Sequence, residues 1–110
     1  MATGSLLPIT FDLEWVEGDE FEWSWPVSYA DGTDLDWSGT YVAEMIPVDG
    51  GDTTTLTCTA VHSGTSTTFT VGLAYNNAGN VAGEYVWRAR SSTDKVTRFQ
   101  GTVRITAAIT

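Results

Sequence analysis

The chain has 110 residues, of which 42% are hydrophobic and 17% charged, and this length and composition fit one folded globular domain. Its 14 acidic and five basic residues give a formal net charge of −9, which disfavours binding to nucleic-acid phosphates and to anionic membranes. The single cysteine, Cys58, excludes an internal disulfide framework and a zinc site built from several cysteines.

Alternation of apolar and polar residues predicts two strands at the start of the domain. The first spans residues 9–16 and the second residues 21–29, with a turn signal at Glu17-Gly-Asp between them. The two segments form a predicted hairpin, in which the carboxylates of Glu14 and Glu22 face each other on the polar side.

Five more strands follow, each bounded by residues that favour turns. They span residues 41–48, 53–62, 67–73, 84–90 and 96–106, and no segment keeps a helical period. Short strands with a turn about every 8 to 12 residues predict an all-β fold, namely an immunoglobulin-like antiparallel β-sandwich of about seven strands. Residues 9–110 form this single domain behind a flexible N-terminal arm, residues 1–8.

The arm is neutral and ends in apolar residues. Free in solution it is a disordered tail, whereas against a neighbouring subunit Leu6, Leu7 and Ile9 would anchor it. No apolar run approaches the roughly 18 to 20 residues of a membrane span, and the first residues lack the pattern of a signal peptide. We therefore expect a soluble protein that is made inside a cell and does not bind membranes.

Four of the five tryptophans divide into two groups. Trp15, Trp23 and Trp25 share the phase of the apolar residues in the first two strands, so we expect them in the core. Trp37 lies in a polar loop and is the best candidate for an exposed aromatic contact. A carbohydrate-binding module that stacks tryptophan rings on sugars remains an alternative.

Catalytic and metal-binding patterns are weak in this sequence. His62 is the only histidine and is interpreted as a partly exposed residue at a strand end, and Cys58 as a small buried residue. The pair Glu14 and Glu22 is better explained as a solvated strand face than as a glycosidase pair. The run from Asp31 to Asp36 lacks the spacing of a helix-loop-helix calcium site. We predict no enzyme activity, no cofactor and no bound metal.

Charge is divided unevenly along the chain. Residues 1–52 contain 12 acidic residues and no basic one, whereas residues 53–110 carry two acidic and five basic residues. Alternation puts Arg88, Arg90, Arg98 and Arg104 on the outward face of the last hairpin, where no acidic residue of the hairpin neutralises them. Two interpretations stay open. The arginines pair within the chain with Glu14, Glu20 or Glu22, or they contact the acidic face of another copy and build rings or lattices.

The order of several motifs resembles a known family, the small β-sandwich virion proteins of tailed bacteriophages, which are related to the N-terminal domain of baseplate upper proteins. The likeness rests on Glu17-Gly-Asp-Glu-Phe, the spacing from Tyr29 to Tyr41, Val42-Ala-Glu-Met-Ile, Ala82-Gly-Glu-Tyr-Val-Trp-Arg-Ala-Arg, and Val96-Thr-Arg-Phe-Gln-Gly-Thr-Val-Arg-Ile-Thr. It spans most of the chain. One departure is Trp37-Ser-Gly-Thr-Tyr, where the family has a Leu-Thr-Gly-Tyr run.

The resemblance implies a non-enzymatic structural protein of the virion. A capsid decoration protein, bound outside the major capsid lattice and stabilising the head, is the form we expect, and a tail or baseplate structural protein is the alternative. The implied partners are the major capsid protein and copies of the chain itself, with a trimer favoured. The implied location is the virion, with assembly from protein made in the host cytoplasm.

Overall fold

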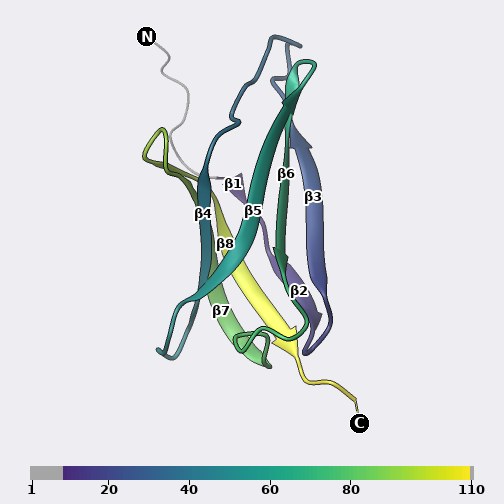
Figure 1. Cartoon of the computed structure of the whole chain (residues 1–110), viewed down its shortest axis with the longest axis vertical. Coiled ribbons are helices and arrows are strands. Elements are labelled where there is room, and N and C mark those ends of the chain that lie inside the picture. Colours follow the sequence, from purple (N-terminus) through teal and green to yellow (C-terminus); the bar gives the residue numbers. More distant parts are fainter. Residues whose placement is uncertain (1–8, 110) are drawn as a thin grey trace.

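A computed structural model describes residues 9–109, which form an all-β fold of eight strands (Figure 1). The predicted all-β class is confirmed. All seven predicted segments are strands, and the first of them is divided in two at Phe11 and Asp12. The strands are β1 (Ile9–Thr10), β2 (Leu13–Val16), β3 (Phe21–Val27), β4 (Tyr41–Pro47), β5 (Thr54–Ser63), β6 (Ser66–Leu73), β7 (Gly83–Ser91) and β8 (Val96–Thr106).

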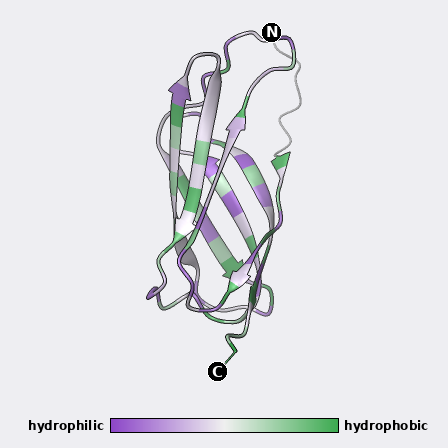
Figure 2. Cartoon of the chain, turned by 90° about the vertical axis from the view of Figure 1, so that its right-hand side faces the viewer, coloured by the Kyte–Doolittle hydropathy of each residue, from purple (hydrophilic) through white to green (hydrophobic). Residues whose placement is uncertain are grey.

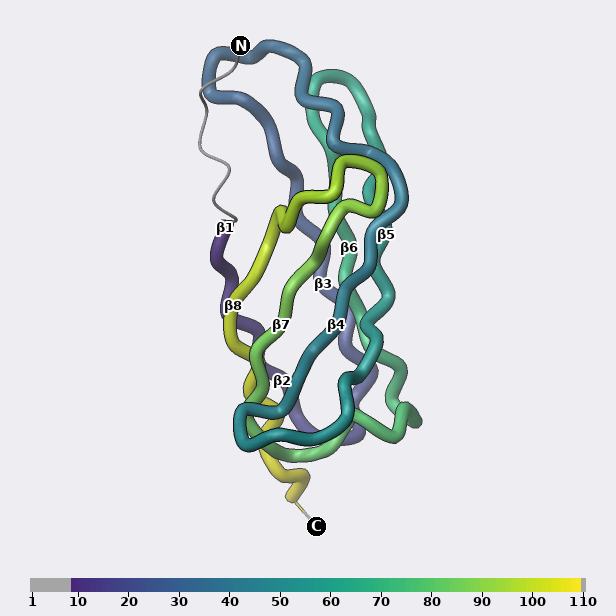
Figure 3. Tube along the Cα trace, turned by 90° about the vertical axis from the view of Figure 1, so that its left-hand side faces the viewer, coloured from purple at the N-terminus to yellow at the C-terminus, as the bar shows by residue number. Residues whose placement is uncertain are grey.

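The strands join into one continuous sheet that curls around a common core. Its order is β1-β8-β7-β4-β5-β6-β3, and β2 also pairs with β8. Strand β5 makes the bend, because its start pairs with β4 through Leu56 and Ala43, while its remainder pairs with β6. Strands β4, β7 and β8 therefore form one side of the molecule (Figure 3), and β3 and β6 form the other (Figure 2).

Aromatic side chains from both sides meet in the core. Phe69 of β6 and Phe99 of β8 are fully buried, with ring centres 4.6 Å apart, and Trp25 of β3 contacts Phe99 edge-on at 4.9 Å. Trp15 and Trp25 are buried as predicted, and Trp23 is partly buried against the same core. Burial of such large rings supplies most of the driving force for folding a domain of this size.

The pairing of the first strands differs from the prediction. Strands β1 and β2 lie parallel to β8, with Ile9 opposite Phe99 and Leu13 opposite Val103, so the sheet is not antiparallel throughout. After β2 the chain crosses to the far end of the sheet, where β3 pairs with β6. The predicted hairpin between the first two segments is therefore wrong, because alternation identifies strands but does not identify their partners.

A close crossing at Gly101 fixes the first strands in place. Trp87 stands opposite Gly101 in the pairing of β7 and β8, and its indole Nε1–H reaches past this glycine to donate to the Phe11 carbonyl at 2.8 Å. A methyl group added at Gly101 would overlap that carbonyl oxygen. Beside the crossing, the Asp12 carboxylate accepts from both the N–H and the hydroxyl of Thr102, at 3.1 and 2.9 Å.

The curled sheet has β1 and β2 at one end and β3 at the other. Side-chain contacts, rather than a ladder of backbone hydrogen bonds, join these two ends, and we call the junction the seam. Within the described residues, β3 pairs only with β6. Across the seam, Trp15 stacks on Phe21 with ring centres 4.1 Å apart, and Phe11 meets Trp23 edge-on at 4.9 Å.

Asn80 ties the lower end of the fold together. It is buried, accepts from Trp15 Nε1 at 3.0 Å, and donates to the carbonyl of Asp19 at 2.9 Å. The turn after β2 and the loop before β7 are thereby held against each other.

We predict that Gly101→Ala lowers the free energy of unfolding by about 2–3 kcal/mol, because the added methyl separates Phe11 from Trp87. Urea denaturation followed by tryptophan fluorescence measures this change. Gly18→Ala is the control, since Gly18 has open space around it but a positive φ of 81°. It should cost only about 1 kcal/mol. A loss at Gly101 no larger than that at Gly18 would contradict the role given to the crossing.

Candidate interaction surface

Three of the four arginines predicted to face outward lie on the outer side of β7 and β8. Alternation exposes Arg88 and Arg90 on β7 and Arg104 on β8. Glu44 stands opposite Arg88 in the pairing of β4 and β7. Arg88 Nε donates to Glu44 Oε1 at 2.9 Å, and a terminal nitrogen of the guanidinium lies 2.7 Å from the same oxygen. This carboxylate holds Arg88 flat across the sheet.

Arg98 does not join this surface. A β-bulge shifts the pairing after Ala89, so that Arg90 stands opposite Thr97 and the alternation is broken at Arg98. The Arg98 side chain is only 17% exposed and donates to Asp94 Oδ2 at 2.7 Å. The outward placement of Arg98 is therefore wrong. Asp94 belongs to the same hairpin as Arg98. The expectation that no acidic residue of the hairpin neutralises its arginines is therefore also wrong.

The acidic neighbours of Arg104 come from both adjacent strands. Glu14 on β2 and Glu84 on β7 stand in register with Arg104, and all three are exposed. Glu20 instead accepts from a backbone N–H of the loop after β6, and Glu22 lies on β3 across the core. Of the three predicted in-chain partners, Glu14 alone stands beside an arginine. Glu14 and Glu22 do not face each other across a hairpin, although both line a shallow groove of about 260 Å³ at the seam.

A shallow groove of about 440 Å³ crosses the outer side of β4, β7 and β8. Its floor includes Ile46 and Val86, and Val86 is 47% exposed. Val42, 49% exposed, continues the apolar surface beyond the Arg88–Glu44 pair. Exposed aliphatic side chains beside a fixed ion pair are typical of a surface that binds another protein. We call this the groove face, defined by Thr10, Val42, Glu44, Ile46, Val86, Arg88 and Gln100.

The groove face ends at the first strand. Ile9 of β1 is 39% exposed at the edge of the same sheet. The predicted anchors Leu6 and Leu7 lie outside the described residues.

Trp37 is not the exposed contact that was predicted. It is partly buried against the core, and the Arg98 guanidinium covers its ring at 4.4 Å from the ring centre. Tyr41 donates its hydroxyl to the Trp37 carbonyl at 2.7 Å. The β-bulge at Arg98 turns the guanidinium onto this ring. No sequence pattern predicts this bulge.

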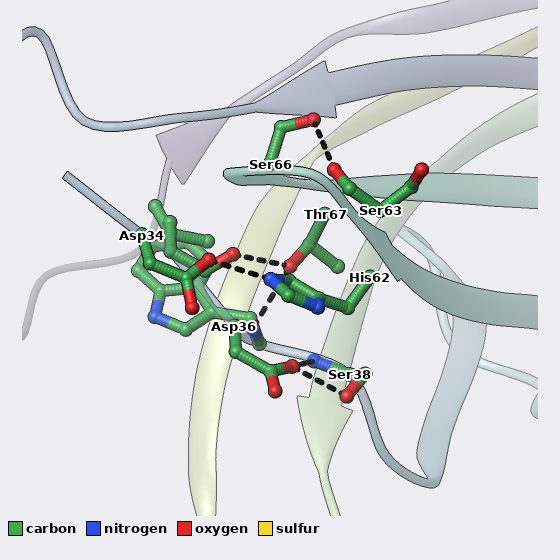
Figure 4. Close-up of polar contacts among 9 residues, drawn as sticks. Asp34, Asp36, Ser38, His62, Ser63, Ser66 and Thr67 are labelled. Atoms are coloured by element: carbon green, nitrogen blue, oxygen red, sulfur yellow. Dashed lines mark hydrogen bonds and ion pairs between the residues drawn. The ribbon is translucent and has the colours of Figure 1, made fainter. Parts of the chain in front are cut away.

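The long loop between β3 and β4 is fastened to the hairpin of β5 and β6 (Figure 4). The buried Thr67 hydroxyl donates to the Leu35 carbonyl at 2.9 Å and accepts from the Trp37 N–H at 2.9 Å. His62, at the end of β5 as predicted, lies 2.6 Å from Asp34 through its Nε2. This hydrogen bond to Asp34 raises the pKa of His62 above its ordinary value.

The other polar side chains of this loop bind locally. The Asp31 carboxylate accepts from Thr33 and the Asp36 carboxylate from Ser38, and these bonds lower the pKa of both aspartates. Over residues 9–109, no three His, Cys, Asp or Glu side chains are grouped so as to hold a metal ion. Burial raises the pKa of the Cys58 thiol to about 11, so this cysteine is a thiol at neutral pH.

No protein-family model matches the sequence, and no curated protein matches it either. In the part of the chain that the structure describes, no helix is long and apolar enough to cross a membrane.

We predict that Asp34→Asn lowers the pKa of His62 toward its ordinary value, about 6.5. NMR titration of the single histidine measures this change. Because the pKa of His62 is raised in the folded state, its bond to Asp34 stabilises the fold fully below about pH 6.5. That stabilisation is lost as the pH rises through the folded-state pKa. The difference in thermal midpoint between wild type and Asp34→Asn should therefore narrow at alkaline pH.

Asp31→Asn is the matched control, since it removes a carboxylate from the same loop without touching His62. An unchanged His62 pKa in Asp34→Asn would show that the contact does not form in solution.

Proposed function

We propose that this chain is a non-enzymatic structural protein of a tailed bacteriophage virion, acting as a capsid decoration protein on the outside of the major capsid lattice. The order of motifs in the sequence supports the family. Two of the motifs, those that begin at Ala82 and Val96, make up β7 and β8 and so build much of the groove face.

The groove face is the observation that carries the proposal. Strands β4, β7 and β8 pair along their lengths, so this face is stiff. It presents exposed Val42 and Val86 beside the Arg88–Glu44 pair, and a protein partner would cover both kinds of group at once. On a closed capsid lattice, many such modest contacts add to a strong total attachment.

We propose further that the curled sheet is a variant of the immunoglobulin-like sandwich. The order β3-β6-β5 on one side and β4-β7-β8 on the other supports this, because it has the three-strand cores of the two immunoglobulin sheets. Strand β5, which takes part in both sides, is the departure from separate sheets.

The proposed partners are the major capsid protein and copies of the chain itself. Exposed acidic residues of one copy and the exposed Arg90 and Arg104 of the next would meet in a heterologous contact that closes into a ring, with a trimer favoured. Such contacts between exposed charges weaken as salt is added.

Two alternatives have less support. A tail or baseplate location would use the same groove face against a different virion protein. Sugar binding through tryptophan is disfavoured because Trp15, Trp25 and Trp87 are buried and Arg98 covers Trp37. Trp23, in the seam groove, is the tryptophan left for such a role.

We predict that Arg88→Glu weakens binding of the purified full chain to empty heads of the phage that encodes it by about tenfold or more, because a carboxylate replaces the cation beside the groove. Co-sedimentation with heads at low salt measures the binding. Adding salt should weaken wild-type binding.

Lys95→Glu is the matched control, since it makes the same charge change at the tip of the β7–β8 hairpin, away from the groove. The double variant Glu44→Arg with Arg88→Glu keeps the in-chain pair and so separates binding from folding. Wild type that fails to bind heads, or equal loss in Arg88→Glu and Lys95→Glu, would contradict the proposal.

A further inference from the structure

The outer side of β3, β5 and β6 is rich in hydroxyl groups. Along β5, alternation turns Thr55, Thr57 and Thr59 outward, while Leu56, Cys58 and Ala60 turn toward the core. Strands β3 and β6 follow the same alternation. We call this surface the hydroxyl face, and it is defined by Ser24, Thr57, Thr59, Thr68 and Thr70.

One row of hydroxyls crosses all three strands of this face. Thr59, Thr70 and Ser24 are in register on three neighbouring strands, and the hydroxyls of Ser24 and Thr70 lie 2.7 Å apart. Val61, 59% exposed, stands beside Thr68 in the next row. Outward side chains are about 7 Å apart along a strand and about 5 Å apart between neighbouring strands.

This face is almost without charge on a chain of net charge −9. Among the described outward positions of β3, β5 and β6, Glu22 is the one charged residue. The outward positions of β7, by contrast, include Glu84, Arg88 and Arg90. Charged side chains on a protein surface keep copies of the same sign apart and in solution. The hydroxyl face lacks that protection.

We propose that the hydroxyl face is a contact between two copies of this chain, related by a two-fold axis. In a two-fold contact the same patch meets itself, so its groups must be complementary to themselves. A hydroxyl is both donor and acceptor and meets this condition, whereas a carboxylate facing a carboxylate does not. Two strongly acidic copies also repel each other least when they approach through an uncharged face.

The proposed contact has a small area, and this area determines the concentration at which the pair forms. Three short strands cover roughly 300 Å² per copy, against about 800 Å² per partner in a standard stable interface. The pair therefore forms at high local concentration, such as that on a crowded particle surface. Because the remaining force between copies is repulsion, added salt strengthens this contact. The heterologous charge contacts of the proposed function respond to salt in the opposite direction.

Sedimentation velocity of the full chain over a concentration series at low and high salt tests the proposal. We expect a dimer that increases with concentration and with salt. Thr59→Lys, which places a charge in the middle row of the face, should weaken the dimer by about tenfold or more although it lowers the net negative charge. Thr40→Lys, the same change at an exposed loop position, should leave the dimer intact.

The outcomes separate this proposal from the capsid proposal. A chain that stays monomeric at every concentration in high salt, or a dimer that survives Thr59→Lys, would overturn the hydroxyl contact and leave head binding untouched. Failure to bind heads would overturn the capsid proposal and leave the salt-strengthened dimer standing. Unfolding of Thr59→Lys would be seen in its circular dichroism, and Thr70→Lys then serves as the second variant on the same face.

Discussion

The crossing of Phe11 over Gly101 is the constraint on which the arrangement of the strands depends. The indole of Trp87 reaches the Phe11 carbonyl only because the residue between them has no side chain. This contact sets the first strands parallel to β8. The chain must then pass to the opposite end of the curled sheet to begin β3, which places the aromatic residues of β2 against those of β3 across the seam.

One consequence is a molecule with two different outer surfaces. The groove face combines aliphatic side chains with a fixed ion pair, and the hydroxyl face carries hydroxyls with almost no charge. Both are strand surfaces supported from beneath by the same aromatic core. A stiff body with two unlike faces suits the repeating assembly that we propose, in which each face would contact a different neighbour without competing with the other.

Much of the fold was predictable from alternation alone. The period-2 pattern located all seven segments and the burial of Trp15 and Trp25, because side-chain direction in a strand is local. Partner choice is not local, and so the parallel pairing of β2 with β8 was missed. Glycine at position 101, in phase with Phe99 and Val103 on the inward face, was the one sign in the sequence that another segment approaches there.

The site was only partly predictable for a related reason. Arg88, Arg90 and Arg104 followed the alternation of their strands, and a bulge removed Arg98 from it. Because the bulge shifts the alternation, the Arg98 side chain is mostly buried and its guanidinium lies over the Trp37 ring. The ion pair of Arg88 with Glu44 depends on β4 lying next to β7, which spacing along the sequence does not reveal.

Electron cryo-microscopy of the proposed phage virion tests the central claim most directly. We expect copies of a narrow body, 51 by 25 by 21 Å, on the outside of the head with the groove face turned toward the capsid lattice. Copies whose groove face points to solvent, or a head that carries no density of this shape, would contradict it.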